Sequence, residues 1–259
     1  MYTLNAAFVG KVLLVFDELP STNDYARLIA NEGQTQEGTV VQTSRQTSGR
    51  GQMGAVWESA PGTNLTLSVI LQPTWLRADQ QFHLSKVVAL AVYDTVQEVT
   101  EPLPANFSLQ VKWPNDILLN GKKIAGILIE NTISGAYLGI SIAGIGLNVN
   151  QQTFSPALPM AGSLVQLTGH TFDTDHLAQR LFAHLELRYL QLRGGATDLL
   201  HTDYLARLLG YREHRHFELL PEGTQVEGMI TGVDEHGRLV VENAGAEQKF
   251  GLKEIKMLL

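Results

Sequence analysis

Lysines and an Asn-Asp pair are concentrated in residues 112–130, which read KWPNDILLNGKKIAGILIE. The dipeptide Asn120-Gly121 stands between two apolar runs, and both central positions of a tight hairpin turn require positive φ, so we predict a hairpin here. Because Pro114 cannot donate a backbone hydrogen bond and restricts its neighbour, the residues around it should form a shaped loop. Cations beside such a hairpin indicate a site for an anionic ligand. The same pattern also fits a solvated lysine-rich turn, so this segment alone leaves both interpretations open.

A second segment whose residues could bind a ligand is the polar, glycine-rich stretch 44–64, SRQTSGRGQMGAVWESAPGTN. It joins two predicted strands, Thr39 to Thr43 and Leu65 to Leu71. Connections of this length inside a compact domain are uncommon and are usually functional or disordered. Its glycines let backbone N–H groups approach an anion, and Arg45 and Arg50 add charge. The spacing matches neither a Walker A loop nor a dinucleotide fingerprint. The alternative is an inert surface loop, against which the tryptophan and the dense glycines weigh.

Two shorter motifs allow either a structural or a functional reading. Ser21-Thr22-Asn23 precedes a helix predicted to end near Asn31, and helix capping alone would explain these polar residues. Gly144-x-Gly146, followed by Asn148, ends an apolar strand. Glycine at such a position indicates either a close approach of the backbone to a ligand or a simple bend in a core strand.

The elements that must position these motifs alternate between strands and helices. Strands are predicted at Val12 to Phe16 and Tyr137 to Val149, in addition to those named above, with breaks at Asp17 and after Ser134-Gly135. Helices are predicted at Asn23 to Asn31, Phe82 to Val99, from the Asp173 cap onward, and near Asp198 to Leu209. After Tyr211 the pattern changes to closely spaced short strands, which is typical of a small β-barrel. Because the predicted hairpins are antiparallel, an all-parallel sheet is excluded.

Composition restricts the class of protein. The chain has 259 residues, of which 44% are hydrophobic and 17% charged, as expected for one large and one small globular domain. The formal net charge of −7 argues against a general nucleic-acid-binding protein, which needs clustered surplus lysine and arginine. No apolar run approaches the ~20 residues of a membrane span. The absence of cysteine excludes disulfides, thiolate metal sites and cysteine nucleophiles, and fits a cytoplasmic location.

Five motifs in one order resemble those of biotin–protein ligases, also called biotin–[acetyl-CoA-carboxylase] ligases. They are STN at 21, GRGQMGAVWESAPGTNL from 49, KWPNDI from 112, GKKIAGILIE from 121 and GIGLNV from 144. The C-terminal GVDEHGRLVVE and QKFGLKEIKML resemble the small SH3-like domain of that family. The resemblance implies an α+β fold: a mixed, largely antiparallel sheet backed by helices in a class II synthetase-like catalytic domain, residues 1–210, and an SH3-like β-barrel, residues 211–259.

The resemblance also implies an activity. Such enzymes join biotin and ATP to biotinyl-5′-AMP with release of pyrophosphate, and pass biotin to one lysine of a biotin carboxyl carrier domain. Mg²⁺ would accompany the phosphates, with Asp116 as a candidate ligand. The implied catalytic residues are Arg50, Lys112, Asp116 and Lys123. The implied biotin-binding residues are Ser21, Thr22, Asn23, Gln46, Arg50, Gly51, Gln52, Lys123 and Gly126. The implied ATP- and adenylate-binding residues are Arg50, Gly51, Gln52, Trp57, Lys112, Asn115, Asp116, Lys123 and Asn148.

Side-chain alternation along the second hairpin strand divides its lysines. Lys123 should face the phosphate together with Lys112, whereas Lys122 should point to solvent. The glycine-rich loop is expected to be mobile without ligand and to order over biotinyl-AMP, excluding water from a hydrolysable anhydride.

The chain departs from its relatives in the glycine-rich loop. Many relatives read GRGR where this chain reads GRGQ, so Gln52 replaces a second arginine. Gln52 can still form hydrogen bonds but brings no charge. We hypothesise that Arg50 and the lysines compensate.

A second departure is at the N-terminus. The catalytic pattern begins within the first ~20 residues, which leaves no room for the ~60-residue helix-turn-helix domain of relatives that act as repressors. We therefore expect ligase activity without operator binding or other nucleic-acid partners, in a protein that is a monomer or a homodimer.

Two other functions compete with biotin ligation. A lipoate–protein ligase or octanoyl transferase resembles this fold and acylates a similar carrier lysine, but those families lack KWPND. A catalytically silent biotin-binding module is the non-enzymatic alternative, against which the retained Arg50, Lys112, Asp116 and Lys123 weigh.

Overall fold

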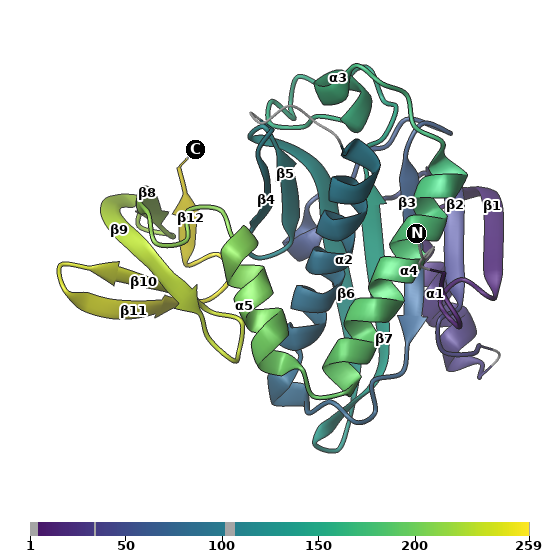
Figure 1. The fold of residues 1–259 in the computed structure, drawn as a ribbon, viewed down its shortest axis with the longest axis horizontal. Coiled ribbons are helices and arrows are strands. Elements are labelled where there is room, and N and C mark those ends of the chain that lie inside the picture. Colours follow the sequence, from purple (N-terminus) through teal and green to yellow (C-terminus); the bar gives the residue numbers. More distant parts are fainter. Residues whose placement is uncertain (1–4, 34, 102–106, 259) are drawn as a thin grey trace.

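The computed structural model describes residues 5–33, 35–101 and 107–258, which form two sheets and a helical layer (Figure 1). The larger sheet has the strand order β1-β2-β3-β7-β6-β5-β4. Strands β1 and β2 pair in parallel, and the other neighbours pair antiparallel, as the predicted mixed, largely antiparallel sheet requires. Its strands are β1 (Leu13–Leu19), β2 (Val40–Gln46), β3 (Leu65–Leu71), β4 (Leu109–Lys112), β5 (Asp116–Leu119), β6 (Lys122–Ser134) and β7 (Tyr137–Leu147).

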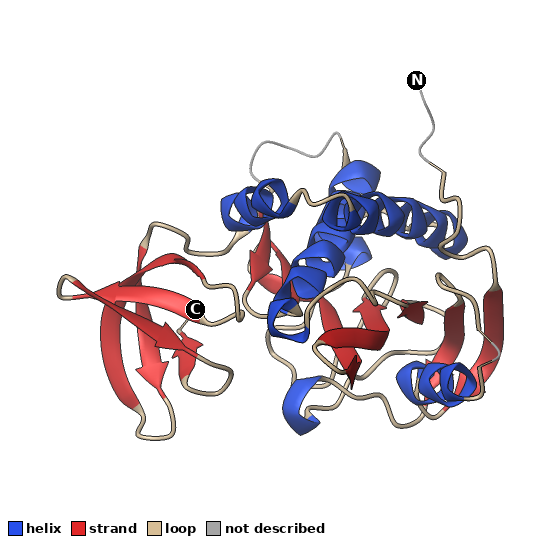
Figure 2. Ribbon diagram, turned by 90° about the horizontal axis from the view of Figure 1, so that it is seen from below, coloured by secondary structure: helices blue, strands red, loops and turns tan. Residues whose placement is uncertain are grey.

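Helices cover both faces of this sheet (Figure 2). One face packs on α2 (Phe82–Thr100) and α4 (Thr174–Arg193), with α5 (Thr197–Arg207) beside them, and the other packs on α1 (Thr22–Asn31). Alternation along β3 explains both contacts, because Leu65, Leu67 and Val69 join the α2–α4 core while Ile70 joins the α1 cluster. The short helix α3 (Leu164–Thr168) follows β7. Within the described residues, none of the helices has both the length and the apolar composition that crossing a membrane requires.

The C-terminal strands form a separate five-stranded antiparallel sheet with the order β11-β10-β9-β8-β12. This sheet is consistent with the predicted SH3-like domain; the boundary after residue 210 stays a prediction. Its β9–β10 turn lies on the larger domain, where Trp113 Nε1 donates to the Gly237 carbonyl at 2.9 Å and the Gly237 backbone lies against the Phe82 ring. Its strands are β8 (His214–Leu219), β9 (Thr224–Val233), β10 (Leu239–Asn243), β11 (Ala246–Phe250) and β12 (Ile255–Met257).

The hairpin and the helix starts that the sequence predicted correctly are set by local turn and capping residues. The predicted hairpin is present as β5–β6, and its two turn residues, Asn120 and Gly121, have φ of 48° and 75°. Ser21 caps α1 by accepting from the Asp24 amide, and Asp173 caps α4. The predicted break at Asp17 is wrong: β1 continues to Leu19 because it stays paired with β2 through its last residue.

Candidate functional site

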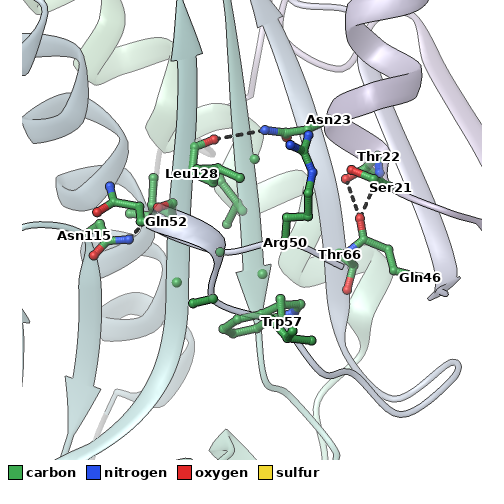
Figure 3. A pocket seen from close by; sticks show the side chains of 18 of the residues that line it. Ser21, Thr22, Asn23, Gln46, Arg50, Gln52, Trp57, Thr66, Asn115 and Leu128 are labelled. Carbon is green, nitrogen blue, oxygen red and sulfur yellow. Dashed lines mark hydrogen bonds between the residues drawn. The ribbon is translucent and has the colours of Figure 1, made fainter. Parts of the chain in front are cut away.

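A cavity of about 220 Å³ lies on the α1 face of the larger sheet (Figure 3). Its floor is a row of directly opposed residues that crosses four strands: Thr66 opposes Gly146, Gly146 opposes Gly126, and Gly126 opposes Asp116. Because directly opposed residues point to the same face of a sheet, the antiparallel register alone brings these positions together. We call this space the ligand cavity.

One end of the ligand cavity is lined by uncharged polar side chains from α1 and β2. Gln46 Oε1 accepts from the Thr22 amide at 2.8 Å and lies 3.1 Å from Thr22 Oγ1. Ser68 Oγ lies 2.6 Å from Asn23 Oδ1 and 2.7 Å from Thr22 Oγ1. Ser21, Thr22 and Asn23 are all buried and line the cavity, and Ser21 also caps the helix.

Lys123 and Asp116 provide the charges at the opposite end. Lys123 Nζ lies 2.7 Å from Asp116 Oδ1, and 5.7 Å from the centre of the Trp57 ring. The side chains of Lys123 and Asp116 are 35% and 18% exposed, so this pair is less screened than a surface salt bridge. A cation held in this way is available to an anion without first being brought out of solvent.

The glycine-rich segment forms a hairpin that covers the ligand cavity. Arg50 bridges Val56 across it, the Gly51 amide donates to the Ala55 carbonyl at 2.6 Å, and the Trp57 amide donates to the Gly49 carbonyl at 3.0 Å. A turn of 3₁₀ helix, Gln52–Gly54, forms its tip. We call residues 49–57 the glycine-rich hairpin; it brings Arg50, Gly51, Gln52 and Trp57 to the cavity, and its ordering by ligand stays a prediction.

Trp57 lies flat against glycines of β6 and β7. A Cβ atom placed on Gly146 would come within 2.3 Å of the indole, and one on Gly126 within 3.0 Å. Glycine at these two positions therefore leaves room for the tryptophan ring to approach the sheet backbone. The neighbouring Gly144 serves the same purpose for Asn23, since its Cβ would lie 2.3 Å from Asn23 Oδ1.

A second cavity of about 200 Å³ lies beyond Trp57 and shares Val56, Trp57 and Lys123 with the first. Asn148 lines it and donates through Nδ2 to the Gly162 carbonyl at 3.0 Å. That bond fixes the amide orientation, which leaves Asn148 Oδ1 buried and without a partner among the described residues, as is Trp57 Nε1. Two residues that line this cavity, Asn148 and Trp57, thus each have one buried polar atom without a partner among the described residues.

One predicted lysine position differs from expectation. Lys112 ends β4 opposite Asp116, at the edge of the sheet, and does not line the ligand cavity. Lys122 does not line that cavity either; its side chain is half-buried, and its Nζ donates to the Pro159 carbonyl in an exposed hydrogen bond of 2.9 Å. Asn115, by contrast, lines the cavity and donates to the Ile127 carbonyl at 2.7 Å.

Sequence reasoning missed several lining residues. Thr66 lines the ligand cavity and Ser68 supports its polar end; the missed signal was two polar residues at alternate positions of an otherwise apolar strand, LTLSVIL. The wall of the second cavity was also missed, although apolar residues in a proline-containing loop were a signal. The other unpredicted lining residues of the two cavities are Ala55, Val56, Glu58, Leu67, Ile127, Leu128, Ile145, Phe154, Ala157, Leu158, Pro159, Met160 and Ala161.

Comparisons with known proteins agree with this geometry. A family model described as the biotin/lipoate A/B protein ligase family matches residues 15–150. The bifunctional ligase/repressor BirA of Bacillus subtilis is 32% identical over 259 residues, which cover 99% of this chain and 77% of that protein. The biotin--[acetyl-CoA-carboxylase] ligase of Mycobacterium tuberculosis is 35% identical over 225 residues, 87% of this chain and 81% of that protein. The structure of a biotin protein ligase from Aquifex aeolicus in complex with biotin and ATP has a TM-score of 0.78 and 25% identity, and the match covers 96% of this chain and 99% of that one. The chain therefore belongs to the biotin/lipoate A/B protein ligase family.

Proposed function

We propose that this protein is a biotin–protein ligase, which activates biotin with ATP to biotinyl-5′-AMP and transfers biotin to a lysine of a biotin carboxyl carrier domain. The observation that carries the proposal is the order of chemistry along the two joined cavities. A neutral polar end is followed by a cationic centre and then by a mostly apolar pocket beyond Trp57. Biotinyl-5′-AMP has the same order: a ureido ring, an acyl phosphate and an adenine.

The neutral end suits the ureido group of biotin. That group has two N–H donors and one carbonyl acceptor and carries no charge, so it needs partners of both kinds and no counter-ion. Thr22, Asn23 and Gln46 supply amide and hydroxyl groups there, and Gln46 Nε2 has no partner among the described residues. Lipoate presents a disulfide at the corresponding end and would leave these groups unpaired, which favours biotin.

The cationic centre suits adenylate formation. A biotin carboxylate oxygen attacks the α-phosphorus of ATP, the bond to the bridging oxygen breaks, and pyrophosphate leaves with that electron pair. Two anions must approach each other, so fixed positive charge and oriented donors lower the barrier. Lys123 stands at this point, Arg50 lines the same cavity, and Lys112 lies outside it, opposite Asp116 on the edge strand β4.

The second cavity suits the adenine ring. Trp57 offers an aromatic face and Asn148 an unpartnered acceptor, which can receive the exocyclic amino group of adenine. Lys123 lines both cavities and would stand beside the phosphate that joins the two halves of the intermediate.

Magnesium fits this site as an ion brought in by the nucleotide. Among the described residues no group of three or more His, Asp or Glu side chains gathers to hold a metal, and Asp116 is the carboxylate that lines the ligand cavity. Bound Mg²⁺ would neutralise phosphate oxygens, and Asp116 would hold it together with those oxygens and water.

The second half-reaction needs a neutral lysine amine. The amine attacks the acyl carbon of biotinyl-5′-AMP, AMP leaves, and the extra proton is lost from the nitrogen. Asp116 would orient the amine or accept its proton, which is a role within reach of a half-buried carboxylate. The acceptor is the carrier domain of a biotin-dependent carboxylase, and we propose that the reaction takes place in the cytoplasm.

One assay tests the proposal against both alternatives. The protein is incubated with Mg-ATP, a carrier domain, and either biotin or lipoate, and pyrophosphate release and carrier labelling are measured. Labelling that depends on biotin is expected. Labelling with lipoate would reassign the substrate, and labelling with neither acid would leave a binding module.

A further inference from the structure

Four charged side chains meet at the rim of the ligand cavity, where the glycine-rich hairpin faces α1 and β6. Arg50 Nη2 lies 2.5 Å from Asp24 Oδ1 and 3.6 Å from Glu130 Oε2. Arg27 Nη2 lies 2.6 Å from Glu130 Oε1 and 3.5 Å from Asp24 Oδ1. Two arginines and two carboxylates thus form a balanced network that joins a loop, a helix and a strand.

The network is linked to the polar end of the cavity. Asn23 donates through Nδ2 to Glu130 Oε2 at 2.8 Å, while its Oδ1 accepts from the buried Ser68 Oγ at 2.6 Å. Asp24 follows Asn23 in the first turn of α1, where a carboxylate is also favoured by the helix dipole. Both acidic residues are therefore fixed by elements of the scaffold, and Arg50 is the partner that comes from the hairpin.

Both contacts of Arg50 use the same nitrogen. Among the described residues, neither Nε nor Nη1 of Arg50 has a partner. Guanidinium carries five donors in a rigid plane, so holding Nη2 orients the group while its remaining donors stay available to an anion. If the two carboxylates occupied every guanidinium donor, they would compete with an anionic ligand. The contacts through Nη2 alone orient Arg50 and leave donors for that ligand.

We propose that Asp24 and Glu130 are positioning residues that hold the Arg50 guanidinium, and with it the glycine-rich hairpin, against α1 and β6. These contacts would limit the mobility of the hairpin before any ligand is present, in contrast to the sequence-based expectation of a mobile loop. The contact of Arg50 with an anionic intermediate, and so the retention of that intermediate, rests on the proposed ligase function; the holding of the hairpin does not.

The holding of the hairpin is tested by trypsin, which cleaves after arginine. The Arg50–Gly51 bond of the ligand-free protein is the site followed, with its fragments identified by mass spectrometry. In the double variant Asp24→Asn/Glu130→Gln we expect cleavage at this bond to be about three- to tenfold faster, as loss of the two partly exposed ion pairs of Arg50 permits. Glutamine at 130 keeps an acceptor for Asn23, so the change is confined to charge.

Two further variants keep this test decisive. The single variant Asp24→Glu keeps a carboxylate at this position, and trypsin should cleave it after Arg50 at close to the wild-type rate. Glu18→Gln removes the partner of Arg45, an exposed pair at 2.8 Å on the neighbouring strands, and should leave cleavage after Arg50 unchanged. If the double variant is poorly folded by circular dichroism, Asp24→Asn alone is used, since the Asp24 side chain is 50% exposed. Equal cleavage of wild type and variant at Arg50 would overturn the proposal.

Retention of the intermediate is tested by the dissociation rate of biotinyl-5′-AMP, measured by rapid filtration. We expect dissociation from the double variant to be about three- to tenfold faster than from the wild type. Raising KCl from about 0.05 to 0.5 M should speed release from the wild type more than from the variant, because salt screens the ion pairs that the variant lacks. A purely structural role would not change this salt response.

The outcomes separate the two proposals. Identical release rates and salt responses in both proteins would overturn the positioning role even if the enzyme is active. If the wild type binds no biotinyl-5′-AMP, the ligase proposal fails, and the trypsin measurement on the ligand-free protein still decides whether Asp24 and Glu130 hold the hairpin.

Discussion

Two lysines in different regions of the molecule face opposite electrostatic situations. Lys123, in the ligand cavity, has its Nζ 2.7 Å from Asp116 Oδ1 and 5.7 Å from the centre of the Trp57 ring. Lys86, at the junction of α2, α5 and the C-terminal domain, is 2% exposed; its Nζ lies 3.0 Å from His201 Nδ1 and 5.6 Å from the Phe82 ring.

The two lysines differ in burial and in whether a carboxylate lies within ion-pair distance. Burial lowers the pKa of Lys86 to about 8, and the more distant Asp234 only partly opposes this. Burial and the Lys86 charge also lower the pKa of His83 and of His201. The junction therefore penalises cations, whereas the cavity supplies a carboxylate for its lysine. Charge at the junction therefore costs stability.

The largest effect should come from removing the cavity lysine. Lys123→Ala eliminates the cation nearest the proposed phosphate and leaves Asp116 unpaired, so biotin-dependent pyrophosphate release should fall by about 10²–10³-fold. Lys122→Ala is the matched control, because Lys122 lines neither cavity and only its Nζ contacts the Pro159 carbonyl at the wall of the second one, and it should lose less than about fivefold. If Lys123→Ala released pyrophosphate at the wild-type rate, Lys123 would have no role in stabilising the proposed phosphate.

The opposite result is expected at the junction, where removing the lysine should stabilise the protein. The pKa of Lys86 is about 8 in the folded state against its ordinary 10.5, so the unfolded state binds more protons between these values. The free energy of unfolding should rise with pH through this window, with the full cost present below about pH 8. Lys86→Met should raise the free energy of unfolding at pH 7 by on the order of 2–3 kcal/mol and flatten this dependence.

Thermal or urea unfolding at several pH values measures this effect. Lys256→Met is the control, since that side chain is 63% exposed and its substitution should change stability by less than about 0.5 kcal/mol. Destabilisation by Lys86→Met at pH 7 would mean that the contact with His201 outweighs the desolvation of the ammonium group.

A smaller effect is expected at the floor of the cavity. Gly146→Ala places a Cβ 2.3 Å from the Trp57 indole, so the ring must move away from the sheet. We expect the KM for ATP to rise by about tenfold, because the shared wall of the two cavities is displaced, with a smaller change in the KM for biotin. Gly232→Ala is the matched control in β9, where an added Cβ meets no atom within 4 Å. An equal rise in the KM for ATP and in the KM for biotin would contradict a specific role of Trp57 in nucleotide binding.

These residues also show what a sequence can and cannot predict. The hairpin at Asn120-Gly121 was predicted because two adjacent residues determine its backbone, and the covering glycine-rich segment because its composition is unusual. The position of Lys112 at the sheet edge and the contact of Lys122 with the Pro159 carbonyl depend on strand pairing and on a returning loop. Such long-range contacts leave no local pattern, and the ion pair of Arg50 with Asp24 was missed for the same reason.

The smallest effect should come from adding charge to the cavity at Gln52. This residue lines the ligand cavity beside Asn115. If Arg50 and Lys123 already neutralise the proposed phosphate, a further cation gains little and must itself be desolvated. Gln52→Arg should therefore change the dissociation rate of biotinyl-5′-AMP by less than about twofold. Markedly slower release would show that compensation is incomplete and that the wild-type cavity has one cation fewer than its ligand can use.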